Sequence, residues 1–138
     1  MTKSNFSITE KNIMNLRSLF YLNAIFLISG SLALILAPAI VLERQGFTTD
    51  NPEFLQLGSN SGGLMLCIGL VAWFAARAAD SPFRRQVRLA FFILHLTFVL
   101  IHTGAWLFNG IALSIVIPVH FIFTLAFGYF QFVKPDAE

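Results

Sequence analysis

Four long apolar stretches divide the chain, and short polar segments separate them. They cover about residues 19–42, 55–76, 89–108 and 110–133. A helix that crosses a bilayer needs about 20 predominantly apolar residues, and each stretch meets that length. The pattern predicts an all-α, polytopic membrane protein in which a single domain, residues 1–138, forms an antiparallel four-transmembrane-helix bundle with left-handed packing.

The connections between the stretches are short. The predicted loops are residues 43–54 and 77–88, while only Asn109 and its neighbours join the last two stretches. The second loop contains Pro82, and proline suits the first turn of a new helix. The sequence therefore predicts a tight hairpin for the last two helices.

Three other prolines bear on the helices. Pro52 follows Asp50 and Asn51, either of which suits a helix cap, so a short surface helix is predicted to lead into the second stretch. Pro118 lies in the middle of the fourth stretch, where a missing amide donor and a clash with the preceding turn predict a kink. Pro38 is predicted to do the same, less disruptively, near the end of the first stretch.

Positive charge is distributed unevenly about these stretches. Eight of the nine Lys and Arg residues fall on one side of a four-span arrangement, and only Arg44 falls on the other. Cytoplasmic loops of membrane proteins carry an excess of Lys and Arg. Both termini are therefore predicted to be cytoplasmic, with the 43–54 loop on the outer side. The eight are Lys3, Lys11, Arg17, Arg77, Arg84, Arg85, Arg88 and Lys134.

Composition narrows the class of protein. The chain is 57% apolar and 12% charged, whereas soluble domains carry about a quarter charged residues. The net charge of +2 indicates no nucleic-acid partner, because basic residues at membrane edges suit the lipid headgroups of the bilayer. Cys67 is the only cysteine, which excludes an intramolecular disulfide. The four stretches contain no Asp or Glu, and no catalytic residue is predicted.

Small residues recur at helical spacing along three of the stretches. Such residues let helices approach closely in lipid, where close packing drives association. They predict helix-packing faces within the bundle, and a homo-oligomer interface on the second stretch is the alternative. The predicted packing residues are Gly58, Gly62, Gly69, Ala72, Ala33, Ala37, Thr124 and Gly128.

All three histidines lie within the apolar stretches. Counted from the basic residues at the helix ends, His102 and His120 both lie about 21 Å into the membrane, with Ser31 at the same level. His95 lies closer to the cytoplasmic side, near the level of Asn23. Intramembrane histidines usually face protein or water.

Three interpretations of the histidines remain open. Each can be a neutral residue that bonds a neighbouring helix: His95 with Asn23, and His120 with the carbonyl freed by Pro118. His102, His120 and Ser31 can instead be the polar contacts of a pocket for a lipid, quinone or other apolar ligand. His102 and His120 can also hold haem. A metal site is not predicted, because three histidines at uneven depth fit metal geometry poorly.

The chain resembles the DoxX-like group of small bacterial four-helix membrane proteins over most of residues 17–133. The first stretch ends in Leu36-Ala37-Pro38, the second runs from Gly62 to Leu70 as GGLMLCIGL, and a basic loop precedes the third. The resemblance implies a multi-pass protein of the bacterial inner membrane that often acts as an accessory subunit. No redox motif accompanies it, so oxidoreductase activity is not expected.

The expected function is non-enzymatic. The chain is predicted to be a small integral subunit that packs against, stabilises or helps assemble a larger membrane complex. Its expected partners are the bilayer and other membrane subunits, or further copies of itself. The alternative is a membrane protein that binds a lipid, quinone, haem or pigment through His102 and His120.

Overall fold

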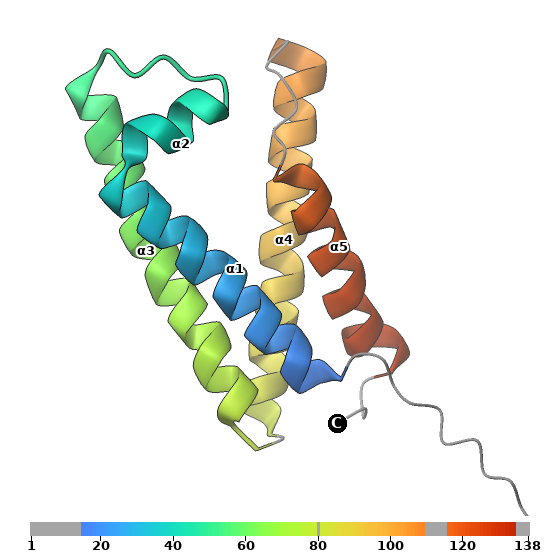
Figure 1. The fold of residues 1–138 in the computed structure, drawn as a ribbon. Coiled ribbons are helices and arrows are strands. Elements are labelled where there is room, and N and C mark those ends of the chain that lie inside the picture. Colours follow the sequence, from blue (N-terminus) through green and yellow to red (C-terminus); the bar gives the residue numbers. More distant parts are fainter. Residues whose placement is uncertain (1–14, 80, 110–115, 135–138) are drawn as a thin grey trace, which may run out of the picture.

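The computed structural model describes residues 15–79, 81–109 and 116–134 (Figure 1). These ranges contain helices and no strand, which confirms the predicted all-α class. Helices α1, α3 and α4 are each long and apolar enough to cross a membrane, and the apolar helix Ile117–Val133 is shorter. Residues 110–115, where the predicted fourth stretch begins, lie outside the described residues. The elements are α1 (Leu16–Leu36), α2 (Pro38–Arg44), α3 (Pro52–Arg77), α4 (Pro82–Asn109), α5 (Ile117–Gly128) and a π-helical turn, η1 (Tyr129–Val133).

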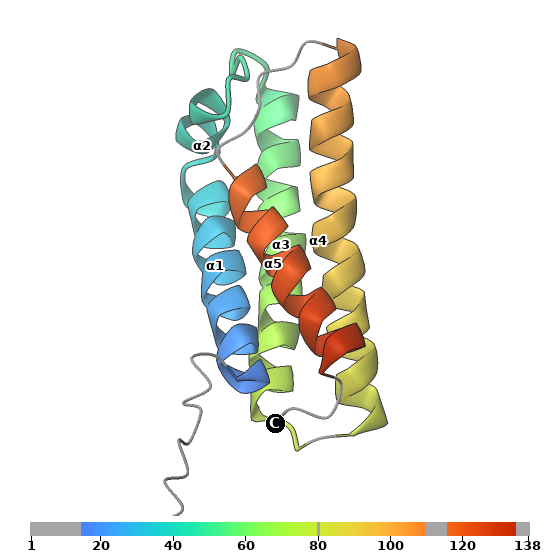
Figure 2. The ribbon, with the colours of Figure 1, turned by 90° about the vertical axis from the view of Figure 1, so that its right-hand side faces the viewer.

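The long helices form two antiparallel pairs. Helix α1 packs along α3, and α4 packs along α5 (Figures 1 and 2). The pairs approach each other at the end where α1 begins and α3 ends, and they diverge toward the end that carries α2 (Figure 1). The first of these ends, called the basic end here, carries Arg17, Arg77, Arg84, Arg85, Arg88 and Lys134.

A cluster of aromatic rings joins the two pairs near the basic end. Phe20 of α1 lies 6.0 Å from Phe91 of α4 and 5.4 Å from Phe127 of α5, measured between ring centroids. Phe20 and Phe127 are fully buried. Polar contacts reinforce this end, because Arg17 Nε donates to the carbonyl of Ala76 at 3.0 Å. The described core therefore lies mostly in the basic half.

Helix α3 begins where the sequence places a cap and a proline. The Asn51 side chain accepts from the amide of Glu53 at 2.8 Å, and Pro52 occupies the first turn. The helix continues without interruption to Arg77. The predicted cap and the predicted helix start at Pro52 are therefore confirmed, but the short helix expected there is the first part of α3 itself. The predicted loop 43–54 shortens to residues 45–51.

The predicted first span, residues 19–42, is not one helix. Helix α1 ends at Leu36, and α2 begins at Pro38. The axis of α2 turns away from the axis of α1 (Figure 1). Proline disfavours helical geometry in the residue before it, and Ala37 adopts φ −144° and ψ 58°. The break at Pro38 is thus complete where the sequence predicted only a mild disturbance.

Pro118 also differs from the prediction. It is the second residue of α5 rather than the middle of a longer helix, and the first turn tolerates proline because its amides need no helical partner. No kink at Pro118 is required within the described helix. At the other loop, α4 begins at Pro82, so the predicted loop 77–88 shortens to residues 78–81.

The small residues of α3 face α1. A Cβ added to Gly62 would lie 3.0 Å from both Leu34 Cβ and the Ser31 carbonyl oxygen. A Cβ on Gly69 would lie 2.8 Å from Ile28 Cγ1 and 3.2 Å from the Ile28 amide nitrogen. This spacing shows close backbone approach. Gly58 faces α2 instead, because its Cβ would lie 3.0 Å from Leu42 Cδ1. All four predicted packing residues of α3 are buried: Gly58, Gly62, Gly69 and Ala72.

The predicted small residues of α1 lie elsewhere. Ala33 is exposed, and Ala37 is half-buried beyond the end of the helix. The face of α1 toward α3 combines bulky residues such as Ile28 and Leu34, for which the glycines of α3 leave room, with Gly30, whose Cβ would meet Met65 Cε at 2.7 Å. On α5, Thr124 is buried, and Gly128 lies so close to α4 that its Cβ would meet Phe92 Cε2 at 3.1 Å.

Candidate functional site

A cavity of about 420 Å³ lies between the two helix pairs, in the half of the molecule away from the basic end. All five α-helices and the loop after α2 contribute to its wall. Ligand pockets generally occupy about 300–1,000 Å³ and combine apolar walls with a few polar groups. This wall fits that description, because its polar side chains are only Gln45, Ser61, His102 and His120 among the described residues.

Two of the three residues predicted for a ligand pocket lie on this wall. His102 reaches it from α4 and His120 from α5. Ser31 does not line the cavity. It is fully buried on α1 close to Gly62, and its hydroxyl has no hydrogen-bond partner among the described residues.

A buried chain of polar groups leads away from the cavity. His120 Nδ1 lies 2.8 Å from His95 Nδ1, and His95 Nε2 lies 3.0 Å from Asn23 Oδ1. Asn23 and His95 are fully buried, and His120 is 6% exposed. The predicted contact between His95 and Asn23 is present. The chain connects α5, α4 and α1, and so spans both helix pairs.

Aromatic rings enclose these histidines. Phe123 stacks on His95 with 4.9 Å between ring centroids, and Phe26 meets the His120 ring edge-on at 5.4 Å. Phe98 stacks on both His102 and His120, at 4.0 and 3.8 Å. Two rings stacked this closely on one phenyl ring must lie on its opposite faces, because one face has room for only one of them. Phe98 therefore lies between the two cavity histidines.

The arrangement does not fit haem between His102 and His120. A haem with two axial imidazoles needs both rings directed at one iron from opposite faces of a planar macrocycle. Here the Phe98 ring fills the space between the imidazoles. Within the described residues there is also no group of three or more His, Cys, Asp or Glu side chains that could hold a metal ion.

Sequence reasoning missed the contact between His95 and His120. Depth counting set these residues one helical turn or more apart, because it treated the helices as parallel to one another. The Arg88 Nε to Gln131 Oε1 hydrogen bond, at 2.8 Å, places α4 beside η1, the turn that continues α5. Helix α5 runs obliquely across α4, so a given number of its residues covers less depth (Figure 2).

Comparison of the chain with protein-family models, curated proteins and solved structures gives no match in any of the three.

Proposed function

We propose that this protein is a four-span integral membrane protein that holds an apolar small molecule between its two helix pairs. The observation that carries the proposal is the cavity itself, whose apolar wall presents His102 and His120. An ionisable side chain is costly inside a membrane unless protein or water receives it. Placing two imidazoles at one apolar cavity is therefore better explained by a bound molecule than by helix packing alone.

The membrane arrangement is part of the same proposal. The fourth span consists of α5, η1 and residues that precede Ile117, and both termini lie on the cytoplasmic side. The collection of Arg and Lys side chains at the basic end supports that orientation. A DoxX-like relationship and a bacterial inner-membrane location are proposed with it, on the sequence features described above.

Native mass spectrometry tests the ligand. Protein released from its own membranes in mild detergent should carry a small apolar molecule in stoichiometric amount. Ala33 lines the cavity, so Ala33→Trp should fill it and remove that molecule. Leu32→Trp is the matched control, since Leu32 is 45% exposed on the same helix and does not line the cavity. Wild-type protein that carries nothing, or equal loading of both variants, contradicts the proposal.

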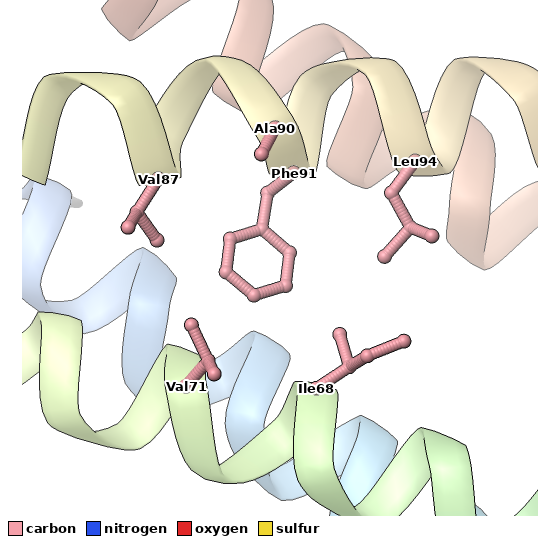
Figure 3. Close-up of a pocket in the computed structure, with 6 residues that line it drawn as sticks. All are labelled: Ile68, Val71, Val87, Ala90, Phe91 and Leu94. Carbon is pink, nitrogen blue, oxygen red and sulfur yellow. The ribbon is translucent and has the colours of Figure 1, made fainter.

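An accessory subunit is the second candidate function, and a groove between α3 and α4 favours it. The groove encloses about 250 Å³ and is lined by apolar side chains only (Figure 3). Only 11% of the apolar window of α4 is buried, against 33% for α1. A partner's transmembrane helix would cover this surface. The lining residues are Ile68, Val71, Val87, Ala90, Phe91 and Leu94.

The same native extraction distinguishes the two candidates. A second polypeptide that co-purifies in fixed ratio, and is lost in Ala90→Trp but not in Leu32→Trp, supports the subunit. Ala90 lies on the groove wall and is exposed, so the larger side chain should block docking without disturbing the core. A chain that is extracted alone, or with a second copy of itself, contradicts the hetero-subunit candidate.

A further inference from the structure

The hydrogen bonding of His102 determines what it offers to the cavity. Its Nδ1 lies 2.9 Å from the backbone carbonyl oxygen of Phe98, one turn earlier on α4. A carbonyl oxygen can only accept, so the hydrogen of this bond belongs to Nδ1. A neutral imidazole has a single N–H, which leaves Nε2 with a lone pair. Nε2 has no hydrogen-bond partner in the described part of the chain.

The position of the hydrogen on His120 follows from two successive hydrogen bonds, and it also leaves Nε2 as an acceptor. The Asn23 amide places Oδ1 toward His95, and an amide oxygen accepts only, so the hydrogen lies on His95 Nε2. In neutral His95 the other nitrogen, Nδ1, is then an acceptor, and His120 Nδ1 donates to it at 2.8 Å. The remaining nitrogen of His120, Nε2, has a lone pair as well. Burial favours the neutral form of both imidazoles, because burying an ionised group is costly.

We infer that the cavity presents two acceptor nitrogens, His102 Nε2 and His120 Nε2, and binds an apolar molecule whose headgroup donates hydrogen bonds, as a hydroxyl does. The inference rests on the proposed function and names the class of ligand. A headgroup with only acceptor atoms, such as an ether or ester, would set its lone pairs against those of the imidazoles. Aromatic rings at the wall, including Phe26 and Phe98, favour an aromatic headgroup.

Asn23 is a positioning residue in this scheme. It does not line the cavity, yet its amide orientation sets which nitrogen of His120 carries the hydrogen. A reversed amide, with Nδ2 donating to His95, would reverse the donor and acceptor roles in both hydrogen bonds. His120 Nε2 would then be a donor. His102 does not depend on Asn23, since a backbone carbonyl fixes its hydrogen.

Nitrogen NMR of the full chain in detergent tests the inference without any ligand. In protein labelled with ¹⁵N-histidine, ring-nitrogen shifts and couplings assign each hydrogen. We expect hydrogen on Nε2 of His95 and on Nδ1 of both His102 and His120. Hydrogen on Nε2 of His120, or on Nε2 of His102, overturns the corresponding half of the inference.

A pair of probes tests the ligand class. The probes 4-nonylphenol and 4-nonylanisole share a ring and tail, and differ because a methyl group replaces the phenolic hydrogen in the second. The phenol should bind about tenfold more tightly, as a lost hydrogen bond to a buried acceptor is expected to produce. His102→Leu should weaken binding of the phenol and reduce the difference in affinity between the two probes, because one of the two acceptors that distinguish them is gone. Equal affinities in wild-type protein overturn the donor inference but leave the cavity proposal standing. Failure of both probes to bind overturns both proposals.

Discussion

At the residue scale, Asn23 and His95 form a buried polar contact that links α1 to the other helix pair. Each is fully buried, and the His95 Nε2–H has Asn23 Oδ1 as its acceptor at 3.0 Å. Asn23→Leu keeps the branched shape of the side chain but leaves that N–H without a partner. We expect the free energy of unfolding in detergent to fall by about 1 kcal/mol, because the cost of the unsatisfied His95 donor is offset in part by removal of Asn23 Nδ2, which is buried without a partner among the described residues.

The neighbouring residue supplies the control for this prediction. Leu22 is 52% exposed on the outer face of α1, so Leu22→Ala should change stability by less than about 0.5 kcal/mol. Equal stability of Asn23→Leu and wild-type protein would mean that His95 has another acceptor. The ring-nitrogen shifts of His95 in the variant would then show which nitrogen has kept its hydrogen.

The sequence allowed part of this polar chain to be predicted. The pairing of His95 with Asn23 follows from depth counted along the third and first apolar stretches, since α4 and α1 are regular helices over those distances. The pairing of His95 with His120 does not follow, because it depends on how steeply α5 crosses α4. Helix inclination is set by side-chain packing between the two helices, and no local pattern in either helix encodes it.

At the element scale, two adjacent glycines of α3 experience opposite surroundings. A Cβ on Gly62 would meet the Ser31 carbonyl oxygen and Leu34 Cβ at 3.0 Å, whereas a Cβ on Gly63 would meet nothing within 4 Å. Gly62→Leu should therefore force α1 and α3 apart and lower the free energy of unfolding by about 1–3 kcal/mol. Thermal denaturation monitored by circular dichroism in detergent measures the loss.

Gly63→Leu is the matched control, with the same substitution one residue away. It should be neutral or slightly stabilising, because replacing glycine within a helix favours the helix by up to about 1 kcal/mol. If the two variants have the same stability, close contact between α1 and α3 at Gly62 is not what holds this pair together.

Element boundaries show where sequence reasoning works and where it does not. Pro52 and Pro82 were predictable helix starts because polar residues precede both, and the polarity marks the change. Pro38 and Pro118 lie within uniformly apolar sequence, so hydropathy does not reveal that a new helix begins there. Proline has opposite effects at the first turn and in the helix interior. Whether Pro38 and Pro118 lie in a first turn or in a helix interior is therefore known only from where α2 and α5 begin in the structure.

At the scale of the whole molecule, the cavity is a consequence of how the pairs are joined. Aromatic packing around Phe20 holds the two pairs together at the basic end. The Arg17 and Arg88 hydrogen bonds join the helices within each pair at the same end. Toward the other end the pairs diverge, and the break at Pro38 lets α2 and the following loop contribute to the cavity wall there. The small residues predicted from the sequence account for the close packing of α1 on α3. They do not account for the divergence of the two pairs.

The proposed orientation follows from the same asymmetry and can be measured directly. In a Cys67→Ala background, which removes the only native thiol, Thr48→Cys and Ala79→Cys place single exposed thiols in the two loops at opposite ends. A membrane-impermeant maleimide should label Thr48→Cys in intact cells and Ala79→Cys only after lysis. The physical reason is that Arg and Lys near the ends of short loops hold those loops on the cytoplasmic side.

The reverse labelling pattern would place the basic end outside, and the charge asymmetry would then need another explanation. Labelling of both thiols in intact cells would instead indicate a mixed orientation, or that α3, the helix between them, does not cross the membrane. In the proposed orientation, α2 and the loop of residues 45–51 face the outer side, so the cavity lies closer to that surface. A ligand would then enter the cavity from the outer half of the bilayer rather than from the cytoplasm.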